Sequence, residues 1–426
     1  MQLDHATPEQ LRQWESELAA DYKAIVEQNL NLDLTRGKPS PEQLSLSDAL
    51  DGILNGNYRA EDGTDSRNYG GLDGLPEAKR LGADIMGVDP ADVLVGGNSS
   101  LTLMFQMMLT AHQFGLTGPD SAWKHDGAVK VICPVPGYDR HYTVCEQLGI
   151  DMVTVPMTAQ GPDMDAVEAL IKKDPAIRGM WCVPKYSNPT GVVYSDETVE
   201  RIAALGKIAN PNFRVFWDNA YAVHDLTDDA PALSCIMSAC KRLGTEDSVL
   251  QFASTSKITH AGAGVAFVNA SQANLKGLKA FLSTCTIGPD KVNQIRHARF
   301  LPNRDALLAH MKAHAELLQP RFEAVLSALK EAFADTDLGA WEAPEGGYFV
   351  SFDTRPNCAR ETVKLAAEAG VKLTPAGATF PYGKDPQDCN IRIAPSVPSV
   401  SEVVSAMKVF VICVKLASVR AKLAQS

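Results

Sequence analysis

The sequence predicts an α/β protein, with a large domain built on a mainly parallel sheet of seven strands and a smaller α+β domain. Two observations support this fold class. The 426 residues are 45% hydrophobic, which is enough to bury more apolar surface than one core usually contains. From about residue 92 onward, short apolar segments alternate with helical ones, as in parallel strands that helices cover on both faces.

The first expected element is a helix over residues 8–29. Thr7 is placed to be its N-cap and Pro8 its first residue, and Leu11 and Leu18 belong to an apolar series with helical spacing. The stretch LNLDLTRGKPSP follows and ends in a Gly and Pro break. We therefore expect one N-terminal helix before the sheet begins.

Strand and helix candidates then alternate. The apolar segments are, in order, DVLVGG, AVKVICPVPG, DMVTVPM, IRGMWCVPKYSNPTG, FRVFWDNAYA and SVLQFASTSK. The helical segments among them are SSLTLMFQMMLTAHQFG, DRHYTVCEQLG, MDAVEALIKK and SDETVERIAALGKIA. In such sheets ligands bind where strands end and helices begin, so polar residues at these points are the candidate site.

The remainder of the chain predicts the smaller domain. A long helical stretch over residues 292–333 leads to WEAPEGGYFVSFDT, another helix, VKLTPAGATFPY and CNIRIAPS. We expect residues 1–50 to form an N-terminal arm and part of the small domain, residues 51–300 the large domain, and residues 301–426 the rest of the small domain. The late apolar run MKVFVICVKLASVRAK is too short to span a bilayer and predicts a packed helix.

Composition limits the partners. A net charge of −11 argues against nucleic acid. Nine scattered cysteines without a CxxC pair, and an N-terminus that lacks a secretion signal, favour a cytoplasmic protein with no membrane partner. His310 and His314 lie one helical turn apart without a third ligand, so no metal site is expected.

Polar residues follow two of the predicted strands. Ser99 and Ser100 open a helix in GGNSSLT, where backbone N–H groups and hydroxyls can bind a phosphate. A plain strand-to-helix turn with a capping serine is the alternative. Asn188, in YSNPTG, is either an ordinary turn residue or a fixed amide donor at the edge of the sheet.

Charged residues stand at three further places. Asp218 ends the strand FRVFWD, where a carboxylate is costly unless it caps a helix or pairs with a protonated ring nitrogen. Arg392 lies within the apolar strand NIRIAPS and suits either an internal salt bridge or a substrate carboxylate. Lys257, in STSK, is a solvated loop charge or an amine used in chemistry. Only pyridoxal 5′-phosphate needs all of these groups together, with the lysine as a Schiff base.

The chain resembles the fold-type I, class I/II pyridoxal-phosphate-dependent aminotransferases, closest to the aspartate aminotransferases of a divergent bacterial subgroup. The resemblance covers residues 32–395. STSK resembles the family's Ser-x-x-Lys signature, which implies that Lys257 forms the Schiff base and that Ser254 and Ser256 bind the cofactor. DNAY resembles the family's Asp-x-x-Tyr, assigning Asp218 to the pyridine nitrogen and Tyr221 to O3′.

Four more motifs carry the resemblance. NPTG implies that Asn188 bonds O3′, and NIRIAP that Arg392 holds the substrate α-carboxylate. PVPGYDRHY places Tyr138 where relatives stack an aromatic ring on the pyridine. RNYGGLDGLPEAKR implies that Tyr69 reaches the phosphate of a neighbouring subunit, so the resemblance implies a homodimer with shared active sites.

One motif departs from the family pattern. Relatives carry an arginine in a Gly-x-Arg-x-Gly-like segment after the lysine, whereas this chain reads HAGAGVAF, with Gly264 nearest that position. The phosphate charge must then be met by backbone, hydroxyls or another cation. Phe267 also takes the third glycine place of GxGxxG, so a dinucleotide site is not supported.

The resemblance implies transfer of the amino group of aspartate to 2-oxoglutarate, giving oxaloacetate and glutamate. A dicarboxylate needs a second cation, for which Arg36 beside Gly37 is our choice, and Lys38, Arg140 and Lys291 are the rivals. A surface ion pair is the alternative role for Arg36. Transamination of another amino acid, or decarboxylation or β-elimination with the same cofactor, stays open. A transcriptional regulator with this domain is disfavoured by the acidic composition.

Overall fold

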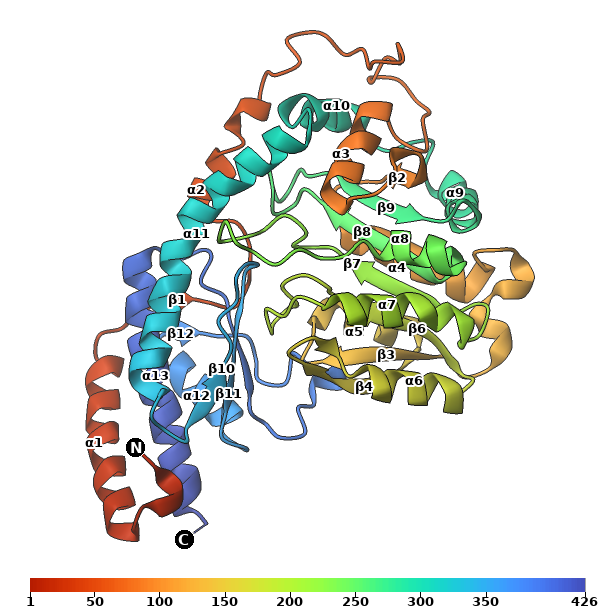
Figure 1. Cartoon of the computed structure of the whole chain (residues 1–426). Coiled ribbons are helices and arrows are strands. Elements are labelled where there is room, and N and C mark those ends of the chain that lie inside the picture. The colour runs from red at the N-terminus through yellow and green to blue at the C-terminus, as the bar shows by residue number, and fades with distance from the viewer. Residues whose placement is uncertain (426) are drawn as a thin grey trace.

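The computed structural model describes residues 1–425 as two parts connected by a long helix (Figure 1). One part surrounds an eight-stranded sheet, and the other contains two short sheets and the first and last helices of the chain. Helix α11 (Arg304–Phe333) runs from the top of the first part down into the second, where both termini lie (Figure 1).

The large sheet has the strand order β2-β9-β8-β7-β6-β3-β4-β5. The four pairings β4–β3, β3–β6, β6–β7 and β7–β8 are parallel, while β9 is antiparallel to both of its neighbours and β5 is antiparallel to β4. The strands are β2 (Val93–Val95), β3 (Lys130–Val135), β4 (Asp151–Thr158), β5 (Gly161–Pro162), β6 (Ile177–Cys182), β7 (Arg214–Asp218), β8 (Val249–Ser254) and β9 (Ala266–Ala270).

Helices cover both faces of this sheet, and its central strands β6, β7 and β8 are buried at nearly every position. In β7, Phe216 packs with one helix layer while Val215 and Trp217 pack with the other. The first layer consists of α4 (Ser100–Leu109), α5 (Asp139–Leu148) and α9 (Gln272–Cys285), and a π-helical turn, Thr110–Phe114, extends α4. The second consists of α6 (Met164–Lys173), α7 (Asp196–Ala204) and α8 (Ile236–Leu243).

A third cluster covers the β2 and β9 edge. It joins Val95 and Phe267 to α3 (Pro76–Met86), α10 (Lys291–Phe300) and the start of α11. Short 3₁₀ turns lie at Leu3–His5, Asp48–Leu50, Pro90–Asp92, Pro119–Ser121, Trp123–Asp126, Leu205–Lys207, Glu246–Ser248 and Pro381–Gly383.

The second part brings together segments that are far apart in the sequence. Strand β1 (Leu32–Asp33) pairs in parallel with β12 (Val371–Lys372), and β11 (Val350–Thr354) lies between β10 (Gly339–Trp341) and β13 (Asn390–Ile393) in an antiparallel sheet. The helices here are α1 (Pro8–Val26), α2 (Pro41–Ser45), α12 (Ala359–Glu368) and α13 (Val400–Leu423).

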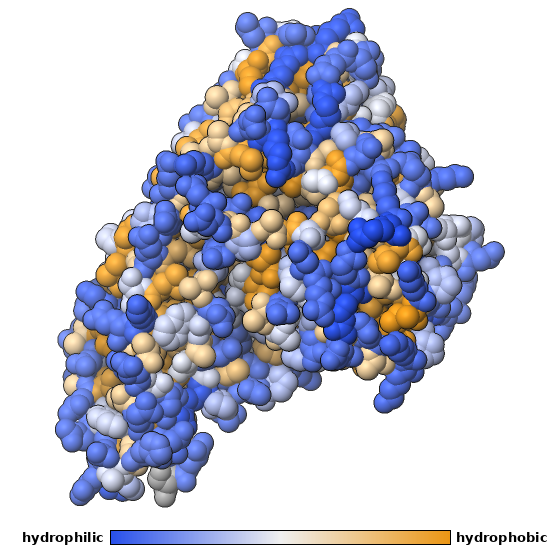
Figure 2. All heavy atoms as spheres, in the orientation of Figure 1, coloured by the Kyte–Doolittle hydropathy of each residue, from blue (hydrophilic) through white to orange (hydrophobic). Residues whose placement is uncertain are grey.

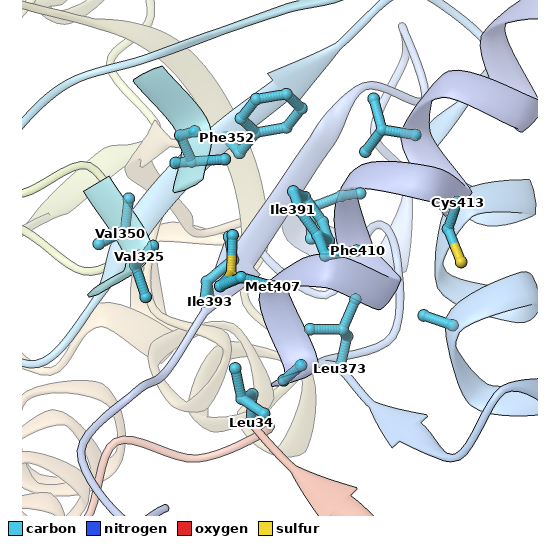
Figure 3. Close-up of a cluster of buried hydrophobic side chains, with 14 of the residues drawn as sticks. Leu34, Val325, Val350, Phe352, Leu373, Ile391, Ile393, Met407, Phe410 and Cys413 are labelled. Carbon is cyan, nitrogen blue, oxygen red and sulfur yellow. The ribbon is translucent and has the colours of Figure 1, made fainter. Parts of the chain in front are cut away.

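The core of this part lies between its small sheet and α13. Figure 3 shows Phe352, Ile391 and Ile393 from the sheet packing against Met407 and Phe410 of α13. Along β11 and β13, apolar residues alternate with polar ones, so the apolar residues share one face of the sheet. That face is buried against the helix. On the face seen in Figure 2, hydrophilic residues cover much of the surface and hydrophobic residues form patches between them.

Several expectations are confirmed and two need correction. Helix α1 starts at Pro8 behind a capping box between Thr7 and Gln10, and the late apolar run is the packed helix α13. The sheet has an eighth strand, β5, a two-residue hairpin extension too short to give a periodic signal. The stretch 292–333 is two helices, because Pro302 and the cap of Asn303 separate α10 from α11. None of the described helices is long and apolar enough to cross a membrane.

Candidate active site

The carboxyl ends of the parallel strands open into a pocket of about 780 Å³. Twelve of the thirteen predicted site residues line it: Arg36, Gly37, Ser99, Ser100, Tyr138, Asn188, Asp218, Tyr221, Ser254, Ser256, Lys257 and Arg392. They come from the ends of β2, β3, β6, β7 and β8, and from β13 and the segment after β1 of the second part. The pocket therefore lies where the strand order reverses around β3, as expected for an open α/β sheet.

Tyr69 is the predicted residue that the structure keeps apart from this pocket. Its side chain is 82% exposed and lines a separate surface hollow together with Ile287 and Lys291. Among the rival cations, Lys38 and Arg140 line the main pocket, whereas the Lys291 ammonium is 2.5 Å from the carbonyl oxygen of Gly70. Lys291 is thus no candidate for the pocket of its own chain.

Lys257 stands in a tight turn directly after β8. Its Nζ lies 5.0 Å from the centre of the Tyr221 ring, in a cation–π arrangement. Burial lowers the pKa of the Lys257 ammonium, and the nearby Asp218 carboxylate opposes this shift. An amine with a lowered pKa is more readily available in its neutral, nucleophilic form.

Asp218 is buried at the end of β7 and uses its two oxygens differently. Oδ2 lies 3.0 Å from Nε2 of His141, whereas Oδ1 has no hydrogen-bond partner among the described residues. His141 is itself buried and stacks on Trp181, with 4.1 Å between ring centroids and 5° between ring planes. A buried carboxylate oxygen without a partner is costly, so a donor from a ligand is expected there.

His141 is a site residue that the sequence interpretation missed. It follows Tyr138, the N-cap of α5, by three residues, so the first helical turn brings the two ring centroids within 5.0 Å of each other while His141 contacts Asp218. That spacing was visible in PVPGYDRHY, but the partner of His141 could be named only after β7 was placed next to β6.

Arg392 is buried in β13 and is held by neighbours from three other segments. Its Nη1 donates to Asp139 Oδ1 at 3.1 Å and to Asn188 Oδ1 at 3.2 Å, and its Nε donates to Thr374 Oγ1 at 3.4 Å. The guanidinium also lies 4.9 Å from the centre of the Phe349 ring. Asp139, which the sequence interpretation also missed, therefore occupies part of the surface expected to bind a substrate carboxylate.

Hydroxyl groups gather at the opposite end of the pocket. Ser99 is the N-cap of α4, yet its side chain makes no capping hydrogen bond. Ser254 Oγ donates to Ser256 Oγ at 3.1 Å, and Ser256 Oγ donates to the carbonyl of Asn98 at 3.1 Å. A helix N-terminus with an uncommitted hydroxyl and a second hydroxyl pair is suited to a phosphate group.

The missing arginine has a steric counterpart in the structure. A Cβ atom on Gly264 would lie 2.9 Å from Thr255 Oγ1 and 3.1 Å from the Ser256 nitrogen. Thr255 Oγ1 cannot easily move, because it accepts a hydrogen bond from the Val265 nitrogen at 2.9 Å. This turn therefore favours glycine, and an arginine at this position would need a different backbone.

Arg36 and Gly37 enter the pocket from the segment after β1. A Cβ on Gly37 would lie 2.5 Å from Cζ of Phe349, so a side chain there would collide with the ring that faces Arg392. Arg36 is exposed, and its guanidinium makes no hydrogen bond or ion pair with any residue in 1–425. Its charge is thus available to a ligand.

The donor set fits pyridoxal 5′-phosphate. The unpartnered Asp218 Oδ1 can accept from a protonated ring nitrogen, and Tyr221 and Asn188 face the same pocket. The amide of Asn188 keeps its NH₂ group available, because only its oxygen is bound by Arg392. The helix N-terminus and hydroxyls around Ser99 complement a phosphate, and the amine of Lys257 complements an aldehyde.

The chain is similar to known aminotransferases. Residues 6–426 match the family model described as aspartate amino-transferase. The chain is 44% identical to the aspartate aminotransferase of Corynebacterium glutamicum over 411 residues, which are 96% of this chain and 95% of that protein.

Solved structures give the same result. The crystal structure of an aspartate transaminase from C. glutamicum has a TM-score of 0.95 and 42% identity, covering 99% of both chains. The α-aminoadipate aminotransferase of Thermus thermophilus, solved with N-(5′-phosphopyridoxyl)-L-leucine, shares the fold, with a TM-score of 0.73 at 20% identity over 92% of this chain and 93% of that one. The chain belongs to the aspartate aminotransferase family.

Proposed function

We propose that the protein uses pyridoxal 5′-phosphate to move the amino group of aspartate to 2-oxoglutarate, giving oxaloacetate and glutamate. The single observation that carries the proposal is the pocket in which Lys257 faces Asp218, whose buried Oδ1 lacks a partner among the described residues. Family membership supports the reaction class. Two of the cations that line the pocket, Arg36 and Arg392, can each bind a carboxylate, which supports a substrate with two carboxylates.

The cofactor, when bound, supplies an aldehyde that reacts with amines and a protonated ring that accepts negative charge from the substrate. Asp218 would keep the ring nitrogen protonated through Oδ1, while His141 orients the carboxylate through Oδ2. Tyr138 would stack on the ring, and Asn188 and Tyr221 would donate to its phenolic oxygen. Lys257 would hold the aldehyde and later, as a free amine, carry a proton on Nζ from the substrate Cα.

Phosphate binding would fall to Ser99, Ser100, Ser254 and Ser256 with the first N–H groups of α4. Arg392 would hold the α-carboxylate of the substrate, since its fork lies beside Asn188 at the buried end of the pocket. Arg36, beside Gly37, would meet the second carboxylate from the open side.

A homodimer with shared active sites is part of the proposal. Tyr69 is 82% exposed and Ile287, in the same hollow, is 67% exposed. Two large, exposed side chains of this kind in one hollow support contact with another protein surface. In a dimer, Tyr69 would reach the phosphate of the neighbouring subunit. Each pocket would then need a second copy of the chain.

We also propose the domain division expected from the sequence and a cytoplasmic location. The pairing of β1 with β12 supports grouping residues 1–50 with residues 301–426, around a large domain over residues 51–300 that binds the cofactor. All nine cysteines are free within residues 1–425, and six are buried, which supports a reducing compartment.

The experiment is to incubate the purified, cofactor-loaded protein with aspartate and 2-oxoglutarate and to measure oxaloacetate, glutamate and carbon dioxide together. Equal amounts of oxaloacetate and glutamate without carbon dioxide are expected. Lys257→Ala should form neither product and should lose the borohydride-reducible link to the cofactor. Carbon dioxide without glutamate would indicate decarboxylation instead, and a covalent link on another lysine would reject the role of Lys257.

A further inference from the structure

Four buried or partly buried side chains converge on two consecutive backbone carbonyls, those of Lys257 and Ile258. The Lys257 oxygen lies 3.2 Å from His224 Nε2 and 3.4 Å from the Tyr348 hydroxyl. The Ile258 oxygen lies 2.7 Å from His310 Nε2 and 2.9 Å from His314 Nε2. We call His224, Tyr348, His310 and His314 the carbonyl clamp. None of the four lines the main pocket.

These carbonyls belong to a short turn that cannot satisfy them itself. The Ile258 and Thr259 nitrogens both donate to the Thr255 carbonyl, at 2.9 and 2.8 Å, which makes residues 255–259 a single helical turn. The last carbonyls of a helical turn have no partner within it and, when buried, need donors from elsewhere. The clamp supplies those donors, so the backbone beneath Lys257 is held by side chains from other segments.

Gln43 orients two members of the clamp at once. It is fully buried, and its amide nitrogen lies 3.0 Å from His314 Nδ1 and 3.0 Å from the Tyr348 hydroxyl, while its amide oxygen accepts from the Ser40 nitrogen at 3.1 Å. By donating to Nδ1, Gln43 leaves the proton of His314 on Nε2, which faces Ile258. By donating to the Tyr348 oxygen, it turns that hydroxyl proton toward Lys257.

The clamp holds the turn without adding charge. Burial lowers the pKa of His314 to about 4 and that of His224 to about 3, and it also lowers the pKa of His310. All three imidazoles are therefore neutral near pH 7. A protonated imidazole here would repel the Lys257 ammonium, whereas neutral donors bind the carbonyls alone.

We propose that Gln43, acting through Tyr348 and His314, is a positioning residue that fixes the turn carrying Lys257, so that its amine points at the substrate carbon. The proposal rests on the role of Lys257 proposed above. In this proposal, Gln43 in the N-terminal segment and Tyr348 just before β11 act on the reacting amine, although neither residue lines the pocket. A misplaced amine should slow proton transfer without weakening substrate binding.

The test compares Tyr348→Phe and Gln43→Met with a matched control, Tyr22→Phe. Tyr22 also donates its hydroxyl to a backbone carbonyl, that of Leu365 at 2.9 Å, but this bond joins α1 to α12. Single turnovers of the cofactor-loaded enzymes with aspartate would give the rate constant and the substrate affinity separately. Hydrogen exchange of the cofactor-free proteins would report the amides of residues 254–262.

Both test variants should lose roughly 5- to 20-fold in the rate constant, with aspartate affinity within about twofold of the wild type. Exchange of residues 254–262 should quicken about fivefold or more in both, and Tyr22→Phe should change neither quantity. The double variant should be much less impaired than the product of the two single effects, because Gln43 acts partly through Tyr348.

Three results would overturn the proposal: unchanged rate constants, a loss confined to affinity, or multiplicative effects in the double variant. If the rate constants are unchanged and thermal stability falls, these residues serve folding alone. If the wild type makes no oxaloacetate from aspartate, the proposed function fails instead. The exchange of residues 254–262 would still decide whether Gln43 and Tyr348 hold the turn.

Discussion

Asp218 shows how one buried carboxylate can be both anchored and available. Oδ2 is bound to His141, and Oδ1 faces the pocket. Asp218→Asn should keep the bond to His141 but remove the negative charge, which matters most as charge develops on the substrate. We expect the single-turnover rate with aspartate to fall by about 100-fold or more, with a small change in binding. A near-normal rate with bound cofactor would reject this role.

Arg36 and Arg392 differ in their surroundings although both line the pocket. Arg392 is buried and held by Asp139, whereas Arg36 is exposed and without a partner in residues 1–425. Arg36→Ala should lower kcat/KM for aspartate and glutamate by about 2 kcal/mol, the lower end of the cost for a charge pair, because the site is open to water. Alanine should be much less affected, and Lys38→Ala is the matched control. Equal losses for aspartate and alanine would make Arg36 structural.

Asp139 lies where a substrate carboxylate must compete for Arg392. Its side chain is 33% exposed and that of Arg392 is 6% exposed, so their ion pair is partly screened by solvent. Asp139→Asn should lower KM for aspartate and alanine alike by roughly fivefold. This factor corresponds to the free energy of about 1 kcal/mol that such an ion pair contributes. Steady-state kinetics with both substrates checks this. A higher KM would mean that Asp139 chiefly orients Arg392.

The turn between β8 and β9 restricts which side chains fit beside the serine hydroxyls of the pocket. Gly264→Ala should force Thr255 Oγ1 away from the Val265 nitrogen and cost about 1–3 kcal/mol of unfolding free energy, as overpacking usually does. Gly262→Ala is the matched control, since no atom lies within 4 Å of its added Cβ. Denaturant unfolding of the cofactor-free proteins measures both. Equal stability of the two variants would contradict the steric argument.

Most elements could be predicted because their signals are local. Apolar runs identified β3, β6, β7 and β8, and the polar residues just after them identified the candidate site, since parallel strands end at one edge. The break between α10 and α11 was missed because apolar spacing continues across Pro302. The contacts of His141, Asp139 and Gln43 could not be predicted, because each joins segments separated by more than 70 residues.

The buried histidines make the stability of the protein depend on pH. The pKa of His314 is lowered from 6.5 to about 4 by burial and by His310. The folded protein then binds fewer protons than the unfolded chain between these values, so its stability is present above pH 6.5 and is lost as pH falls toward 4.

The cofactor-free wild type should therefore lose about 1–2 kcal/mol more unfolding free energy between pH 7 and pH 5 than His314→Gln does. Denaturant titrations at both pH values measure this difference. His5→Gln, an exposed site near the N-terminus, is the control and should keep the wild-type pH dependence. The same dependence in all three proteins would mean that His314 does not contribute.

The pairing of β1 with β12 has a consequence for protein synthesis. All eight strands of the large sheet end by Ala270, so the ribosome can release them for pairing while the last third of the chain is still being translated. Leu32 is made early, but its partner Val371 emerges near the end. Arg36 follows β1 in the sequence, so it reaches its place in the pocket only after β1 has paired with β12. A growing chain can thus complete its sheet well before it can bind a substrate.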